Sequence, residues 1–235
     1  MIAAPPSSSP VIILDNLVKF FGRFAALRGI SATFSAGRLY VVLGDNGAGK
    51  STLLRVIAGL TEPSQGNFML LGSRKVREVA NRVGYMGHAP LLYDELSGME
   101  NLRYFAGLYG IDDDEISRKA MLMVGLDPEL ARRVGQYSQG MRQRLSLARA
   151  VLHDPELMLL DEPFSNVDVH SARDMAAVMG RVRDRGKTIF VVTHQAQLME
   201  AVADEFVHMA AGLIVKRQEA VRAATAVDSA LRTTR

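Results

Sequence analysis

Two short glycine-containing stretches of this 235-residue chain have the residue types that bind phosphate. The first, GDNGAGKST (44–52), fits the pattern G-x-x-x-x-G-K-[ST] through Gly44, Gly49, Lys50 and Ser51. Glycines let backbone N–H groups converge on phosphate oxygens, which side chains would obstruct. The second stretch, YSQGMRQR (137–144), lies far downstream and raises the question of why one chain would carry two anion-binding loops.

Each residue type in the first stretch, here called the phosphate loop, has its own chemical use. Lys50 should reach the β- and γ-phosphates of a nucleoside triphosphate, and the Ser51 hydroxyl should bind Mg²⁺. The helix that follows would point its positive end at the same anion. An ordinary glycine turn is disfavoured, because an apolar run precedes the loop and a helical pattern follows it. The expected nucleotide-binding residues are Asn46, Gly47, Ala48, Gly49, Lys50, Ser51 and Thr52.

Three further polar residues end apolar runs. Asp161 and Glu162 follow LMLL, where Asp161 could hold Mg²⁺ and Glu162 could accept a proton from an attacking water. His194 ends TIFVVTH and could reach the γ-phosphate. The alternative for each is a plain strand end or a structural histidine. The remaining histidines have no metal-ligand spacing, which argues against zinc: His88, His153, His170 and His208.

The elements that must position these groups alternate along the chain. Apolar runs of strand length at 11–14, 39–44, 157–161 and 188–194 are typical of strands, and the later ones of strands buried on both faces of a parallel sheet. Strand, phosphate loop and helix in that order predict an α/β fold with ligands at the strands' carboxyl ends. From about Glu95 to Asp154 the pattern is helical, which indicates an insertion between two parts of one core.

Composition narrows the class of protein. Without cysteine the chain has no disulfide framework and no thiolate metal site. No apolar run approaches the roughly 18–20 residues that span a bilayer, and MIAAPPSSSP (1–10) predicts a disordered leader rather than a signal peptide. We therefore expect a soluble, cytoplasmic protein. The methionines, such as Met121 and Met123, are expected to fill core space.

The charge balance argues against nucleic acid as a partner. Basic and acidic residues number 28 and 25, and no long basic block occurs. The modestly basic end from Lys216 to Arg235 predicts a solvated terminal helix or a frayed tail.

Taken together, the motifs resemble the ATP-binding cassette (ABC) family over about residues 11–217. GDNGAGKST is similar to its Walker A loop, and LMLLDEP to Walker B with the catalytic glutamate. YSQGMRQR, from here on the signature loop, resembles the family signature Leu-Ser-Gly-Gly-Gln. SNVD, with Asp168, resembles the D-loop, and His194 the switch histidine. Phe21, before Gly22, matches the aromatic residue that stacks on adenine.

This resemblance implies a fold and a mechanism. The fold is a P-loop NTPase with a RecA-like core (about 11–94 and 155–217), an N-terminal antiparallel β-subdomain and an inserted α-helical subdomain (about 95–154), followed by a tail (218–235). Two cassettes, identical or different, would enclose two MgATP molecules head to tail. Each nucleotide would then lie between the Walker A loop of one subunit and Ser138, Gln139 and Gly140 of the other.

Several positions depart from the family pattern. Asp45 replaces a usual proline and adds a negative charge near the phosphates. The glutamine of the Q-loop falls on His88, which could contact the metal or its water with a pH-dependent charge. In the signature loop, Tyr137, Gln139 and Met141 replace Leu, Gly and Gln. Because Glu162 and His194 are present, we expect an active ATPase.

The resemblance also suggests a setting. The chain would be peripheral on the cytoplasmic face of the cell membrane, coupled to a separate permease that docks a helix near Tyr85 to Tyr104. GHAPLLYDELSGMENLRYFAGLYG (87–110) further resembles the cytochrome c maturation haem-exporter branch, and related multidrug and lipid exporters share much of it. We expect the transporter to be an exporter, with haem as one candidate substrate. The membrane partner selects the substrate that is transported.

Two other functions compete with this one. A non-transport ABC ATPase acting on nucleic acid or the ribosome would usually have a long coiled-coil insertion or two cassettes, whereas this sequence has one phosphate loop and a short insertion. A nucleotide-binding regulatory module would not need Glu162. Ser138 precedes a helical pattern and could cap the helix that begins there. The start of that helix could then meet a phosphate held by Lys50 of another subunit, which explains why the chain has a second anion-binding loop.

Overall fold

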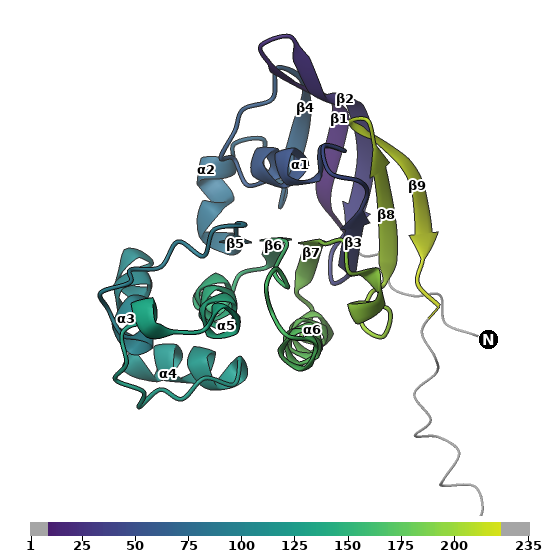
Figure 1. Cartoon of the computed structure of the whole chain (residues 1–235). Coiled ribbons are helices and arrows are strands. Elements are labelled where there is room, and N and C mark those ends of the chain that lie inside the picture. Colours follow the sequence, from purple (N-terminus) through teal and green to yellow (C-terminus); the bar gives the residue numbers. More distant parts are fainter. Residues whose placement is uncertain (1–8, 222–235) are drawn as a thin grey trace, which may run out of the picture.

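Two β-sheets pack on opposite sides of one short helix in the computed structural model, which describes residues 9–221 (Figure 1). The smaller sheet is antiparallel, with the order β2-β1-β4. Its strands are β1 (Pro10–Phe21), β2 (Phe24–Ser35) and β4 (Gln65–Leu70). Helix α1 (Lys50–Ile57) lies against this sheet and contributes apolar side chains to the core that the two sheets share.

The larger sheet has the order β5-β6-β7-β3-β8-β9. Its neighbouring strands are parallel except for β8 and β9, which pair antiparallel. The strands are β3 (Leu39–Leu43), β5 (Val83–Met86), β6 (Leu157–Asp161), β7 (Thr188–Val192), β8 (Glu205–Ala210) and β9 (Leu213–Glu219).

Helices cover the other face of this sheet and form a lobe beside it (Figure 1). The lobe contains α3 (Gly98–Leu108), α4 (Asp114–Met123) and α5 (Gln139–Val151), and α6 (Val169–Asp184) lies under β7. Short pieces complete the described chain: α2 (Val76–Val79) and the 3-10 turns η1 (Ala80–Arg82), η2 (Val134–Gln136) and η3 (Ala196–Leu198). No helix within residues 9–221 has both the length and the apolar character to cross a bilayer.

The buried strands divide their side chains between two cores. In β6, Leu157 and Leu159 join the core around α1, whereas Met158 and Leu160 join the core under α5 and α6. This alternation follows from the two-residue period of a strand, and it explains why the run LMLL is apolar throughout. The predicted α/β class, with an antiparallel β-subdomain and an inserted helical subdomain, is confirmed.

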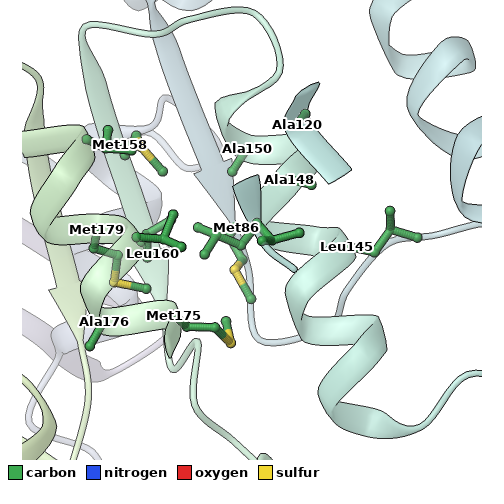
Figure 2. Close-up of a cluster of buried hydrophobic side chains, with 14 of the residues drawn as sticks. Met86, Ala120, Leu145, Ala148, Ala150, Met158, Leu160, Met175, Ala176 and Met179 are labelled. Carbon is green, nitrogen blue, oxygen red and sulfur yellow. The ribbon is translucent and has the colours of Figure 1, made fainter. Parts of the chain in front are cut away.

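Methionines fill much of the second core. Figure 2 shows Met86, Met158, Met175 and Met179 among alanine and leucine side chains of β6, α5 and α6. The flexible thioether side chain fits irregular space between a sheet and crossing helices. Met121 is fully buried and Met123 packs against the same core, so the prediction that methionines are core filler is confirmed.

The ends of the sequence-based domain need correction. Pro10, assigned to the leader, already pairs with Ser35 in β1, and that strand continues well beyond residue 14. Gln218 and Glu219, assigned to the tail, pair with β8, because β9 extends the sheet through them. The expected terminal helix from Lys216 is therefore wrong over residues 216–219. Residues 220 and 221 are not helical either, and residues 222–235 of that prediction and residues 1–8 of the leader lie outside the described residues.

Candidate nucleotide-binding site

The phosphate loop joins β3 to α1 at the carboxyl edge of the larger sheet. Gly44, Gly47 and Gly49 all have positive φ angles, of 150°, 80° and 99°. A Cβ atom at Gly44 would lie 2.1 Å from the carbonyl oxygen of Met209, and one at Gly49 would lie 2.5 Å from that of Ala26. The packing of this chain therefore requires glycine at positions 44 and 49, whether or not a phosphate is bound.

The start of α1 is left open to an anion. Gly49 is the N-cap residue, so no side chain caps the helix, and the first turn contains no acidic residue. The first N–H groups of a helix have no partner within the helix, and the helix dipole adds partial positive charge there. The local geometry thus matches the phosphate-binding role that the sequence predicts for residues 46–52.

Lys50 is nearly buried, at 7% exposure, and its head group is held by the phosphate loop. Its Nζ donates hydrogen bonds to the carbonyl oxygens of Gly44, at 2.7 Å, and Asp45, at 3.0 Å. An ammonium group has three donors, so one donor remains for a phosphate oxygen. The Asp45 side chain itself is exposed.

Ser51 and Asp161 meet where α1 faces the end of β6. The Ser51 hydroxyl donates to Asp161 Oδ1 at 2.8 Å, and Asp161 is 1% exposed. Among residues 9–221 no cationic side chain forms an ion pair with this carboxylate. A buried carboxylate without a counter-ion, beside a hydroxyl, is an oxygen donor set that suits Mg²⁺. The residues present therefore fit the metal that the sequence predicts.

Glu162 occupies a strained backbone position directly after β6. Its φ angle is 51°, in the left-handed region, and its N–H donates to the carbonyl oxygen of Val192 at the end of β7. Its Oε2 lies 3.0 Å from Nδ1 of His194, which follows β7. A positive φ angle at a non-glycine residue raises the free energy of the folded chain, and such residues often occur at functional sites. The ends of β6 and β7 thus bring Glu162 and His194 together at the carboxyl edge of the sheet.

Two adjoining cavities surround these groups. One, of about 320 Å³, is lined by Phe24, His88, Glu162 and residues 46–52 of the phosphate loop. The other is lined by residues 44–46, His88, Glu162, Ser165 and His194. His88 and Glu162 border both cavities, so both residues adjoin the space beside the phosphate loop. Ser165, the first residue of the SNVD stretch, also lines the second cavity, and sequence reasoning gave it no role of its own.

The aromatic residue that lines the cavity beside the phosphate loop is Phe24, whereas the family resemblance predicted Phe21. Phe21 and Phe24 are direct cross-strand partners on either side of the β1–β2 turn, and both are more than half exposed. Paired residues point to the same face of a sheet. Phe24, however, lines the 320 Å³ cavity, and Phe21 is not among its lining residues. The signal for Phe24 was available in the pattern FFGRF, where a third phenylalanine follows the turn.

The signature loop begins a helix, as expected. Ser138 is the N-cap residue of α5, and its Oγ accepts a hydrogen bond from the N–H of Met141 at 3.2 Å. Tyr137 is buried and lies against Gly98 of α3, and Met141 packs on the core of the helical lobe. Tyr137 and Met141 thus stabilise the lobe, whereas Ser138 and Gln139 face solvent.

The D-loop is joined to the signature helix by one arginine. Asp168 caps α6 by accepting from the N–H of Ser171 at 2.9 Å, and this backbone hydrogen bond lowers the pKa of the Asp168 carboxyl. Arg144 of α5 donates to the Ser171 hydroxyl and to Asp174, each at 3.0 Å. The starts of α5 and α6 are therefore held side by side.

The phosphate loop and the signature loop do not share a cavity within one chain. None of residues 137–141 lines either cavity at the phosphate loop. A Cβ atom at Gly140 would have its nearest neighbours at 3.9 Å, which is ordinary contact, and the φ angle there is not positive. Unlike Gly44 and Gly49, Gly140 is not required by the packing of its own chain.

A phosphate loop before a helix, a Ser–Asp pair for a metal and a Glu–His pair at strand ends define a P-loop nucleoside triphosphatase. The family model described as ABC transporter matches residues 27–165. The chain therefore belongs to the ABC transporter family, as an ATP-binding subunit that hydrolyses ATP.

Individual relatives agree with this assignment. The chain is 37% identical over 199 residues to the ABC transporter ATP-binding protein NatA of Bacillus subtilis (strain 168), which covers 82% of this chain and 81% of NatA. It is 33% identical over 210 residues to the bacitracin transport ATP-binding protein BcrA of Enterococcus faecalis, covering 88% and 68%. Its fold matches a dimeric ATP-binding cassette bound to ADP and Pi with a TM-score of 0.80 at 20% identity, over 89% and 99% of the two chains.

Proposed function

We propose that this chain is the ATPase subunit of an exporter, and that it hydrolyses MgATP in the cleft between the phosphate loop and the ends of β6 and β7. The observation that carries the proposal is the convergence of Lys50, Ser51–Asp161 and Glu162–His194 at one edge of one sheet. Charge that develops on the transferred phosphoryl group would meet Lys50, the metal and the start of α1.

The polar groups in the cleft divide the chemistry among them. Ser51 and Asp161 would hold Mg²⁺, which would supply positive charge against the phosphates when bound. Glu162 accepts a proton from the attacking water. His194, in contact with Glu162, orients that water toward the γ-phosphate. His88 borders the same space and would contact the metal or its water.

The exposed phenylalanines at the β1–β2 turn form the base-binding side of the site. We place adenine against Phe21, as the family resemblance implies, and against Phe24, which lines the cavity beside the phosphate loop. The two rings flank a single turn and face the same side, so they can contact one planar base together.

The signature loop completes the site of a second cassette. Ser138, Gln139 and Gly140 offer an exposed helix start, and Asp168 lies at the start of the neighbouring helix. In a head-to-tail dimer, these groups would face the γ-phosphate that the other subunit's Lys50 holds. Whether the second cassette is a copy of this chain or a different one does not change this geometry.

The site pairing has a direct test. In a heterodimer of Lys50→Ala and Ser138→Arg subunits, pairing between subunits leaves one site with both motifs intact, and about half of the wild-type turnover is expected by counting sites. If each chain used its own signature loop, both sites would be damaged and turnover would be lost. Homodimers of each variant serve as the inactive controls.

The membrane partner would be a separate permease at the cytoplasmic face of the membrane. The groove between β5 and α3, near Tyr85 and Tyr104, is the proposed docking site for its coupling helix. A relative named for fluoroquinolones export supports the export direction. Haem export is a second candidate, which the histidine at position 88 and the methionine at position 141 favour through the resemblance.

The decisive experiment on catalysis is Glu162→Gln in the purified chain or its membrane complex. We expect turnover of MgATP to fall by about 10²–10⁴-fold, the usual contribution of a general base, while ATP binding persists and an ATP-bound dimer accumulates. Gel filtration with light scattering measures that dimer. Undiminished hydrolysis by Glu162→Gln would remove Glu162 as the base, and with it the mechanism proposed for this cleft.

A further inference from the structure

A second groove lies away from the phosphate loop, between β5, α3 and the end of α5. Its volume is about 310 Å³. The rim is apolar and open, since Leu91 and Leu108 are 62% and 66% exposed and Tyr109 is 43% exposed. Exposed apolar side chains gathered around one groove mark a contact surface for another protein. This is the groove in which the proposed function places a helix of the permease.

One charged side chain, Arg149 of α5, lines this groove among otherwise apolar, aromatic and imidazole groups. The guanidinium lies 5.0 Å from the centre of the Phe105 ring and donates to the carbonyl oxygens of Leu91, at 3.0 Å, and Tyr85, at 3.4 Å. Within residues 9–221, no carboxylate forms an ion pair with it. Burial lowers the pKa of Arg149, because the charged form loses solvation.

Arg149 therefore has capacity left for a partner. A guanidinium has five N–H donors, and the two carbonyl contacts leave donors free. A partly buried cation without a counter-ion is costly, and its favoured partner is a carboxylate that can accept two parallel hydrogen bonds. The groove therefore has one positive charge, on Arg149, that a negatively charged partner could neutralise.

His153 adds a second polar feature at the same end of the groove. Its ring stacks on Tyr109 with centroids 3.9 Å apart, and its Nε2–H donates to the carbonyl oxygen of Val83 at 3.2 Å. Burial lowers the pKa of His153, so the ring is neutral near pH 7. Its buried Nδ1 has no hydrogen-bond partner among the described residues and can accept one.

We propose that this groove binds an amphipathic helix whose apolar face carries one carboxylate, and that this carboxylate pairs with Arg149. The proposal rests on the proposed function, since the helix would belong to the permease, and it specifies the chemistry of that helix. Apolar residues of the helix would cover Leu91, Leu108 and Tyr109. A helix with a lysine in place of the carboxylate would meet like charge in a poorly solvated place.

The first test uses the wild-type chain and three synthetic helical peptides of about 20 residues, long enough to hold helix in water. The peptides share one leucine stripe and differ in a single central residue of that stripe: Glu, Gln or Lys. We expect the Glu peptide to bind about tenfold or more tightly than the Gln peptide, as hydrogen bonds to charged groups allow, and the Lys peptide most weakly. The Arg149 Nε–H NMR signal should shift with the Glu peptide.

The second test uses variants. Arg149→Gln should remove the preference for Glu over Gln, whereas Arg118→Gln, on the exposed face of α4, should keep it as the matched control. Equal affinity of wild-type chain for the Glu and Gln peptides would overturn the proposal, as would a Glu preference that survives Arg149→Gln. Because Arg149 also holds two carbonyl groups, Arg149→Gln could fail to fold. The wild-type peptide series then decides alone.

Failure of the acidic-helix proposal can be distinguished from failure of the proposed ATPase function. MgATP hydrolysis is measured on the same wild-type preparation. Turnover without a Glu preference would refute the acidic helix and leave the ATPase intact. A Glu preference without turnover would refute the ATPase and leave the chemistry of the groove in place.

Discussion

The phosphate loop and the signature loop both offer a glycine at the start of a helix, but the chain needs those glycines for different reasons. At Gly44 and Gly49, an added Cβ would overlap backbone carbonyl oxygens at 2.1 and 2.5 Å. At Gly140, it would meet nothing closer than 3.9 Å. The phosphate loop is thus built into the core of its own chain, whereas the signature loop is an exposed helix start whose glycine serves no internal purpose.

This difference indicates where each loop acts. A glycine that the packing of the chain requires is no evidence for a ligand, because steric overlap alone explains why glycine stands there. A helical glycine that the fold does not require lowers stability relative to alanine, and so calls for a reason outside the chain. Close approach of another subunit's nucleotide would be such a reason, and it supports the proposed composite site.

The largest expected effect is on stability, from Gly44→Ala. The new Cβ cannot avoid the backbone of Met209, so we expect a loss of roughly 3 kcal/mol or more in the free energy of unfolding. Gly47→Ala is the matched control: it has no steric neighbour, and only its φ angle of 80° is unfavourable, which costs about 1–2 kcal/mol. Urea unfolding followed by circular dichroism measures both. Equal stability of the two variants would contradict the role of the core in shaping this loop.

The second prediction separates the two loops by ligand binding. Lys50→Ala should weaken nucleotide binding to the monomer by about 10- to 100-fold, because a hydrogen bond to a charged group contributes about 1.5–3 kcal/mol. Ser138→Arg should leave monomer affinity unchanged and abolish turnover of the dimer. Titration with a fluorescent ATP analogue under monomeric conditions provides the comparison. A weakened monomer affinity in Ser138→Arg would place the signature loop at its own chain's site.

A third, smaller effect concerns Gly140→Ala. Alanine is the better helix former, so stability should rise by up to about 1 kcal/mol, while turnover falls by about tenfold or more, equivalent to about 1.4 kcal/mol of barrier. Gly107→Ala, in α3 with open space around it, should bring a similar gain in stability and leave turnover as it is. Thermal unfolding and steady-state ATPase assays test the pair. Unchanged turnover in Gly140→Ala would mean that no neighbour approaches this glycine closely.

The smallest effect is the pH dependence that Asp168 adds at the start of α6. Because its pKa is lowered in the folded state, its contribution to stability is present above the usual value of 3.8 and is lost as pH falls through the lower folded pKa. Asp168→Asn should keep the cap and remove this part of the acid dependence. Unfolding free energies measured between about pH 5 and pH 2 give the slope. An unaltered slope in Asp168→Asn would show that the capped carboxylate is not the source.

Sequence patterns were most reliable where local chemistry dictates them. The start of α5 after Ser138 and the contact of Ser51 with Asp161 both follow from residue type and strand order. Phe24 was missed because its place beside the cavity depends on where a hairpin comes to lie. Tyr137 looked like an unexplained departure from the signature, and the structure shows it to be a core residue of the helical lobe.

The sequence by itself determined the chemical parts and their order: a phosphate loop, a metal-binding pair, a base and a second helix start. These are short-range features, since spacing, glycine content and apolar runs specify them locally. Only the tertiary structure decided which glycines the core requires, which phenylalanine lines the cavity, and that Arg149 lies in an apolar groove without a counter-ion. Those properties depend on contacts between residues far apart in the chain, and a linear pattern does not record the space around a side chain.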